Sequence, residues 1–290
     1  MKVGLILGRV YHRPGLTPAE CLRDIAAIGY RNGECFAFVE DTNEVTTFGL
    51  RLEAKEAKQV FSDAGMNVVG SHFYPLTLVE KNFEKYCEYF AETGCRQIGC
   101  GGRESMENMD EILRKCETMN KAGEIAKQFG LRFYYHNHYH EFRKRDGKYI
   151  WHHIQDNTEK GLVFFEIDTY WVARGGADPV SEIKRLKDRL ILIHQKDFSK
   201  DAEEPLCIFD SLVDPDQPIP EEMFQSKRHA GTYTEVGTGI LPIQAYIDAA
   251  NDAGSEYIIL EQDFVSMDMM ESIKISMDSF RKYNGLDLEN

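Results

Sequence analysis

Three polar residues in the C-terminal half of the sequence could together hold a divalent metal ion. Asp168 ends the run LVFFEID, His194 lies within LILIHQKD, and Glu261 ends YIILE. Carboxylates combined with one imidazole suit a hard or borderline ion such as Mn²⁺, Mg²⁺ or Co²⁺ better than a thiolate-rich structural zinc site does. A bound ion could polarise a carbonyl or hydroxyl oxygen, and a neighbouring carboxylate, histidine or lysine could then move a proton. These residues therefore indicate metal-assisted acid–base chemistry.

Further polar residues recur at the ends of β-rich runs along the whole chain. Any one of them alone could cap a loop or form a salt bridge. Glu166 lies two residues before Asp168, so the alternation of a strand places both carboxylates on the same side. Clustered carboxylates need a cation nearby, because ionising several neighbouring carboxyl groups costs free energy unless a positive charge offsets their repulsion. The recurrence favours one shared site, to which the other contributors are Glu34, His72, His136, Asn137, His138, Glu141, Lys196, Asp197 and Asp263.

The elements that must position these residues alternate between short β-rich runs and longer amphipathic runs. Thr17 as N-cap, Pro18 as first helical residue and Gly29 at the end delimit the first helix. This alternation predicts parallel strands joined by crossover helices, and eight such units predict a single (β/α)8 TIM barrel over residues 1–290. Its active site would lie at the carboxyl ends of the strands. The eight β-rich runs are residues 2–7, 33–37, 66–73, 95–100, 131–138, 162–168, 190–197 and 257–263.

A doubly wound open sheet is the alternative fold, but it would carry a glycine-rich phosphate-binding turn after the first strand. Residues 8–12 do not form one.

Two segments interrupt the alternation. Residues 139–160 are aromatic and predicted to be poor in helix. Residues 199–238 form a long, acidic, proline-bearing loop after strand seven, which we expect to cover the barrel mouth or build a subunit contact.

Composition narrows the class of protein. The 290 residues contain 34 Lys and Arg against 48 Asp and Glu, a net charge of −14, which argues against a nucleic-acid partner. No apolar run reaches the roughly 18 residues that a membrane span needs, and the first nine residues are too short an apolar run for a signal peptide. The seven scattered cysteines include no Cys-x-x-Cys pair. We therefore expect a cytoplasmic protein with reduced thiols.

Taken in order, the motifs resemble those of the xylose isomerase-like TIM barrel superfamily. This group contains sugar phosphate isomerases and epimerases as well as the endonuclease-IV barrels of the AP endonuclease 2 type. The resemblance covers nearly the whole chain. It is carried by IGYRNGE at 28–34, GSH at 70–72, YHNHYHEF at 135–142, DTYW at 168–171, HQKD at 194–197, EVGTG at 235–239 and LEQD at 260–263.

The resemblance implies one divalent ion held by Glu, Asp, His and Glu, with Mn²⁺ expected first and Mg²⁺, Co²⁺ or Zn²⁺ as alternatives. Asp168, His194 and Glu261 match three of these ligands directly. Ketose 3-epimerases have the remaining Glu inside strand five, where this chain has YYH at 134–136. We therefore assign Glu141 to that position. Those epimerases also carry a His where this chain has Trp171, so the acid–base set for simple ketose epimerisation is incomplete.

The chemistry implied is removal of a proton next to a metal-polarised carbonyl of a keto-sugar. Return of the proton would make the protein an isomerase or epimerase. Loss of a β substituent would make it a lyase or hydratase on 3-keto-glycosides, of the C-glycoside deglycosidase or inosose dehydratase kind. His138 is the expected base and Lys196 the group that positions a substrate oxygen or stabilises an enolate, with Glu141 and Glu261 also catalytic. The residues expected to bind substrate are His72, Asn137, Tyr170 and Trp171.

Two other classes are less favoured. An endonuclease-IV-like phosphodiesterase would need a basic face and more histidine ligands than strands six to eight supply. A non-catalytic subunit would have no reason to keep four candidate ligands. The expected partner is a small sugar or glycoside, with no nucleic acid and no membrane, while homo- or hetero-oligomerisation stays open. Aromatic residues near the strand ends, including Phe36 and Tyr139, could pack against the C–H face of a sugar.

Overall fold

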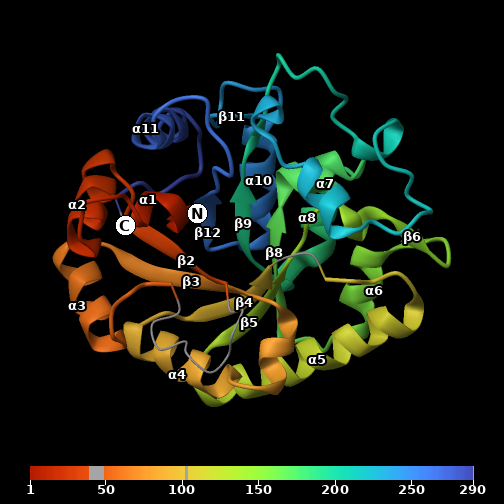
Figure 1. The fold of residues 1–290 in the computed structure, drawn as a ribbon, viewed down its shortest axis with the longest axis horizontal. Coiled ribbons are helices and arrows are strands. Elements are labelled where there is room, and N and C mark those ends of the chain that lie inside the picture. Colours follow the sequence, from red (N-terminus) through yellow and green to blue (C-terminus); the bar gives the residue numbers. More distant parts are fainter. Residues whose placement is uncertain (39–48, 102–103, 290) are drawn as a thin grey trace.

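The computed structural model describes residues 1–38, 49–101 and 104–289, and within them eight parallel strands close into one barrel (Figure 1). The strands pair in the order β1-β12-β9-β8-β5-β4-β3-β2. The predicted TIM barrel is therefore confirmed. The strands are β1 (Lys2–Ile6), β2 (Asn32–Phe38), β3 (Asn67–Tyr74), β4 (Gln97–Gly101), β5 (Arg132–His136), β8 (Val163–Asp168), β9 (Leu190–Gln195) and β12 (Tyr257–Leu260).

Helices cover the outside of the barrel because each has one apolar face to bury. The first long helix begins as predicted: the Thr17 hydroxyl accepts from the backbone N–H of Glu20, and the Glu20 carboxylate accepts from that of Thr17. Leu22 and Ile25 on its inner face are fully buried. The helices are α1 (Gly8–Tyr11), α2 (Pro18–Ile28), α3 (Ala54–Asp63), α4 (Phe83–Thr93), α5 (Met109–Gln128), α6 (Ile150–Asn157), α7 (Thr169–Arg174), α8 (Pro179–Leu186), α9 (Glu221–Ser226), α10 (Ile243–Ala253) and α11 (Met269–Phe280).

The prediction that residues 139–160 are poor in helix is wrong, because this segment contains α6. Ile150, Trp151 and Ile154 form its buried face, at helical spacing. The short hairpin β6 (Lys144–Arg145) and β7 (Lys148–Tyr149) precedes it. The fifth barrel strand also ends at His136, two residues earlier than predicted, so the motif residues after it lie on a loop.

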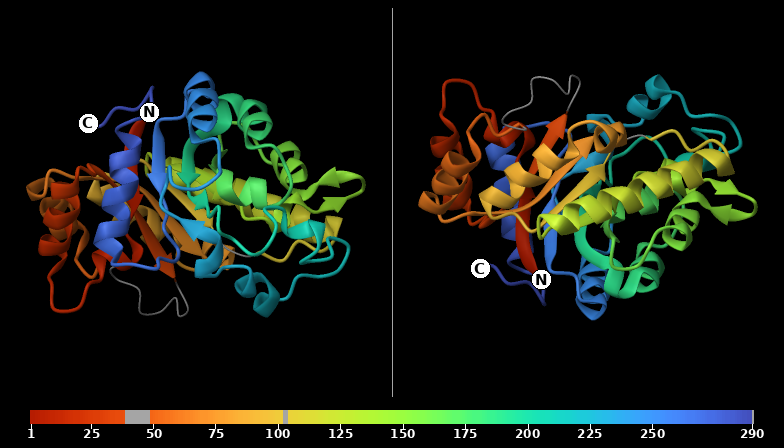
Figure 2. Two further views of the ribbon diagram at one scale, coloured as in Figure 1. Left: turned by 90° about the horizontal axis from the view of Figure 1, so that it is seen from above. Right: turned by 90° about the horizontal axis from the view of Figure 1, so that it is seen from below.

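The 199–238 segment connects β9 to α10 and folds back onto the barrel. The two residues before it, β10 (Asp197–Phe198), pair with β11 (Tyr233–Thr234) near its end to form a small antiparallel sheet. The Asp197 carboxylate accepts backbone N–H bonds from Phe198, Gly237, Gly239 and Leu241 at 2.9–3.1 Å, so this residue holds the segment closed. Figure 2 shows the segment extending toward the barrel end opposite the two chain termini.

The barrel interior is filled by two kinds of side chain. Val69, Leu192 and Ile259 pack with Tyr134 into a small apolar cluster. Polar side chains from the carboxyl ends of the strands lie beyond it. No helix in the described ranges is long and apolar enough to cross a bilayer.

Candidate active site

The pairing of neighbouring strands brings the polar residues of the sequence analysis together inside the barrel. His136 on β5 pairs with Glu166 on β8, and Asp168 on β8 pairs with His194 on β9. Among the described residues, two sets of side chains offer ligand atoms within 4.8 Å of one another. Both include His136 and His194. The inner set adds His72 and Glu166, and the outer set adds Asp168 and Glu261.

The inner set is buried and tightly hydrogen-bonded. His194 Nε2 lies 2.6 Å from Glu34 Oε2 and 3.1 Å from Glu166 Oε1. His72 bonds to Glu166 through its Nε2, and the Tyr134 hydroxyl donates to Glu34. Acidic and imidazole groups therefore alternate through the centre of the barrel, and each carboxylate has a donor.

The outer set joins the barrel interior to its mouth. His194 Nδ1 lies 2.7 Å from Glu261 Oε2, so one imidazole ring connects the inner and outer carboxylates. The ammonium of Lys196 donates to both Asp168 and Glu261. Asp168 also accepts from the backbone N–H of Trp171 at 2.8 Å, which begins α7. Lys196 thus supplies a positive charge between the buried Asp168 and the partly exposed Glu261.

Burial and charge shift the pKa values of these groups in opposite directions. Burial opposes ionisation of Glu261, yet Lys196 and His194 hold the pKa of that carboxyl well below its usual range. Burial also opposes the charged form of His194, but the carboxylates of Glu166 and Glu34 raise its pKa well above the usual value. Burial lowers the pKa of His136 to about 3. In the protein alone, protonated His194 and Lys196 offset the acidic groups.

Glycines make room for this polar cluster. A Cβ at position 70 would lie 2.9 Å from Glu34 Oε1, and one at position 101 would lie 3.1 Å from His72 Nδ1. A Cβ at Gly99 would overlap the ring of Tyr134. Strands β3 and β4 therefore carry small residues where the opposing polar side chains need the space.

The structure does not bring Glu141 into either set of potential metal ligands. Its carboxylate instead accepts from the Tyr135 hydroxyl at 2.7 Å and from the backbone N–H of His138 at 2.9 Å. Burial raises the pKa of Glu141 to about 7. His136 takes the fourth position of the outer set instead. Glu141 shapes the loop that carries His138.

We expect the Glu141→Gln variant to keep its full metal content while losing turnover. The amide can still accept from His138 N–H, but it offers only one acceptor atom where the carboxylate has two. The loop would then hold His138 less firmly, and kcat should fall by about 10- to 100-fold. Metal analysis and steady-state kinetics on the same preparation measure both effects. If the metal content of the variant falls together with its activity, Glu141 is a metal ligand instead.

His138 lies at the mouth of the barrel and is nine-tenths buried. Its ring packs 4.9 Å from that of His136 and 5.2 Å from Phe224 of α9, centroid to centroid. Its Nδ1 has no hydrogen-bond partner among the described residues. Burial lowers the pKa of His138 well below the usual value, so the ring is neutral. A neutral imidazole with an unpaired nitrogen is suited to accept a proton.

The residues predicted to bind substrate have different surroundings. His72 belongs to the inner set. The Asn137 amide exchanges hydrogen bonds with the backbone N–H and carbonyl of Asp168, which ties the ends of β5 and β8 together. Tyr170 donates to the Thr232 hydroxyl at 3.0 Å and is fully buried, as is Trp171. The structure thus uses Asn137, Tyr170 and Trp171 in packing, away from solvent.

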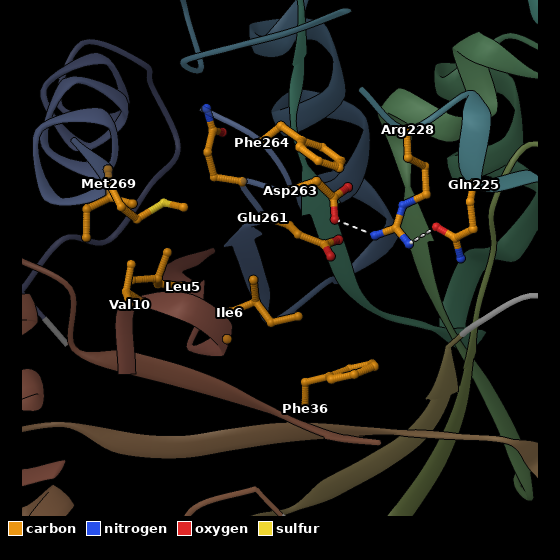
Figure 3. A pocket seen from close by; sticks show the side chains of 13 residues that line it. Leu5, Ile6, Val10, Phe36, Gln225, Arg228, Glu261, Asp263, Phe264 and Met269 are labelled. Atoms are coloured by element: carbon orange, nitrogen blue, oxygen red, sulfur yellow. Dashed lines mark hydrogen bonds and ion pairs between the residues drawn. The ribbon is translucent and has the colours of Figure 1, made fainter. Parts of the chain in front are cut away.

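An open pocket of about 340 Å³ adjoins the outer set (Figure 3). Glu261 belongs to both the pocket lining and the outer set. Arg228 from the 199–238 segment lies beside it and pairs with Asp263, Nη2 to Oδ1, at 2.6 Å. Arg228 was not predicted from any sequence motif, since it reaches the pocket only through closure of the long segment.

Comparison with known proteins places this geometry in a family. The sequence matches the profile of the family described as xylose isomerase-like TIM barrel over residues 22–283. Inosose dehydratase from Clostridium perfringens (strain 13 / Type A), a carbohydrate-acting enzyme by its name, is 23% identical over 262 residues, which are 84% of this chain and 82% of that protein.

Two solved structures share the fold. The sugar phosphate isomerase/epimerase from Parabacteroides distasonis ATCC 8503 gives a TM-score of 0.75 at 22% identity, covering 99% of this chain and 95% of that one. The IOLI protein with a bound zinc atom gives a TM-score of 0.67 at 12% identity, covering 97% of each chain. Since the family profile spans most of the sequence and the barrel is closed as that family requires, the chain belongs to the xylose isomerase-like TIM barrel family.

Proposed function

We propose that this protein is a metal-dependent lyase that acts on a keto-carbohydrate, removing a proton next to the carbonyl and expelling the β substituent. The outer set of ligands carries the proposal, because its one partly exposed member, Glu261, opens onto the pocket. A substrate in that pocket would lie beside Glu261, the residue through which the pocket adjoins the outer set. The curated relative named inosose dehydratase supports elimination as the outcome.

The donor set suits a divalent ion. Two imidazoles, His136 and His194, and two carboxylates, Asp168 and Glu261, offer nitrogen and oxygen ligands without a thiolate. Such a set fits Mn²⁺, Co²⁺ or Zn²⁺ better than Ca²⁺. The zinc of the IOLI protein is in keeping with this assignment. When bound, the ion would polarise the substrate carbonyl and lower the pKa of the adjacent C–H.

The chain's own residues would perform the proton transfers. His138 Nδ1 accepts the proton from the carbon next to the carbonyl, and the C–H electron pair forms an enolate. The electron pair of the enolate then forms a carbon–carbon double bond as the β C–O bond breaks, and protonated His138 gives the proton it has taken to the departing oxygen. For an inosose the leaving group is water, and for a 3-keto-glycoside it is the aglycone. Lys196, which contacts two ligands of the outer set, would orient the enolate oxygen.

Epimerisation is the second candidate outcome. Glu261 and His138 approach the mouth from the ends of β12 and β5, which are separated by β9 and β8 in the barrel. Two proton-transfer groups on different sides of a substrate carbon could remove a proton from one face and return it to the other. This outcome uses the same outer set and the same base.

A substrate screen decides between these outcomes. Metal-loaded protein would be incubated with a 2-keto-inositol, a 3-keto-glucoside and a free ketose, and the products identified by NMR. We expect loss of water or aglycone from one of the first two substrates, with turnover at least 100-fold lower in His138→Asn. Glu182→Gln, which alters the pair between Glu182 on α8 and His152 on α6, is the matched control. A new diastereomer of a ketose without elimination would establish the epimerase instead.

A further inference from the structure

We propose that the pocket beside Glu261 is a second subsite, which takes an apolar, aryl-type substituent on the carbohydrate whose ring reacts at the outer set. The inference rests on the proposed function and narrows its substrate class from inososes and 3-keto-glycosides in general to glycosides with an apolar aglycone. Three features of the pocket support it: its shared wall with the site, its unpaired polar group and its apolar side.

The pocket is connected to the reaction site through one residue. Glu261 contributes a carboxylate to the outer set and also lines the pocket. A ligand bound at the outer set beside Glu261 can therefore extend into the pocket. The pocket volume of about 340 Å³ is in the range of small-molecule sites, so the pocket is large enough to hold a small organic ligand.

One wall of the pocket can form hydrogen bonds that the protein leaves unmade. Gln262 lines the pocket and is 9% exposed, and neither of its buried amide atoms has a hydrogen-bond partner among the described residues. A buried amide without partners destabilises the free protein, and a ligand hydroxyl could satisfy both its donor and its acceptor. Arg228 and Asp263 also line the pocket, already paired with each other. These polar groups suit the polyol part of a ligand.

The other wall is apolar and comes from different elements. Leu5 of β1, Val10 of α1 and Met269 of α11 lie across the pocket from Arg228 in Figure 3, and Phe36 of β2 lies below them. Phe36 is 40% exposed, a large apolar side chain left open at the mouth. The aromatic residues Tyr139 and Trp171, by contrast, are fully buried. Phe36 is thus positioned to stack against a ligand.

A free ketose or inosose carries hydroxyl groups around its whole ring. Against the wall formed by Leu5, Val10 and Phe36, those hydroxyls would lose water and gain no hydrogen bond, which is unfavourable. An aryl group would bury the same wall favourably. The pocket therefore matches a ligand with a polar ring at one end and an apolar group at the other.

Direct binding tests the subsite without requiring turnover. Calorimetry on the full-length, metal-loaded protein would compare phenyl β-D-glucopyranoside, methyl β-D-glucopyranoside and myo-inositol. We expect the phenyl glycoside to bind about tenfold or more tightly than the methyl glycoside. Phe36→Ala and Met269→Ala should bring the ratio of the phenyl to the methyl glucoside affinity close to one. Leu113→Ala, which trims an exposed apolar side chain on α5, is the matched control and should change neither.

The variants also separate this proposal from the proposed function. Gln262→Leu should weaken both glycosides by a similar factor, because it removes the polar contact they share. Equal affinity for phenyl and methyl glucoside, or a phenyl preference that survives Phe36→Ala, would overturn the subsite. If the phenyl preference depends on Phe36 while no keto-carbohydrate is turned over, the subsite stands and the proposed reaction fails.

Discussion

The Asp168→Asn variant is expected to lose divalent metal and to lower kcat/KM by about 10³-fold or more, as removal of several kcal/mol of carbonyl polarisation requires. Asp168 is fully buried at the end of β8, and its carboxylate is one of four donors in the outer set. Asparagine keeps the shape and can still accept from the Trp171 N–H, so the start of α7 should be preserved. The loss would therefore reflect the missing ligand charge. Elemental analysis and steady-state kinetics on the same preparation measure it.

The control for Asp168→Asn is a buried acid elsewhere in the barrel. Glu182 on α8 is paired with His152 Nε2 at 2.9 Å and contributes to neither set of ligands. Glu182→Gln should keep full metal content and turnover. Circular dichroism on both variants checks that the barrel is folded. Normal metal content in Asp168→Asn would remove this residue from the site.

The Lys196→Met variant is expected to be strongly destabilised without metal and largely rescued with it. The ammonium is almost fully buried between Asp168 and Glu261. Removing one partner of a buried ion pair leaves uncompensated charge and costs about 3–5 kcal/mol. A divalent ion bound by the same two carboxylates would restore the missing positive charge. Urea unfolding with and without Mn²⁺ measures this, and Mn²⁺ should stabilise the variant more than it stabilises the wild type.

Rescue of the Lys196→Met variant by Mn²⁺ would distinguish a cation-binding site from an ordinary buried ion pair. Lys115 also forms an ion pair with a buried carboxylate, that of Glu104, and neither residue belongs to the sets of potential ligands. Lys115→Met should be destabilised by a smaller amount, because the lysine is more exposed, and Mn²⁺ should stabilise it no more than the wild type. Equal responses of the two lysine variants to Mn²⁺ would place the ion elsewhere.

Much of the fold and part of the site could be predicted from the sequence for a simple reason. Asp168, His194 and Glu261 each lie at or near the end of a β-rich run, and strand alternation turns their side chains inward. In a closed barrel those ends meet at one face. The start of helix α2 after its N-cap Thr17 could also be predicted from the sequence, because a capping box is a local pattern.

The remaining features depend on distances that no local pattern gives. Whether His136 or Glu141 completes the outer set depends on where β5 ends. The strand stops at His136, and the following turn directs the carboxylate of Glu141 to the Tyr135 hydroxyl. Helix α6 was missed because its apolar residues, including Trp151, also fit an aromatic loop. Arg228 reaches the pocket only because Asp197 closes the long segment over the mouth.

Solvent-deuterium exchange tests the central claim most directly. Removal of a proton next to a carbonyl is common to elimination and epimerisation, so it can be observed whichever product forms. Metal-loaded protein in D₂O would be mixed with a 2-keto-inositol, a 3-keto-glucoside and a free ketose, and the α-C–H signal followed by NMR. We predict loss of that signal for at least one substrate with the wild type, and at least 100-fold slower loss with His138→Asn. An unchanged α-C–H signal for all three substrates would contradict the account.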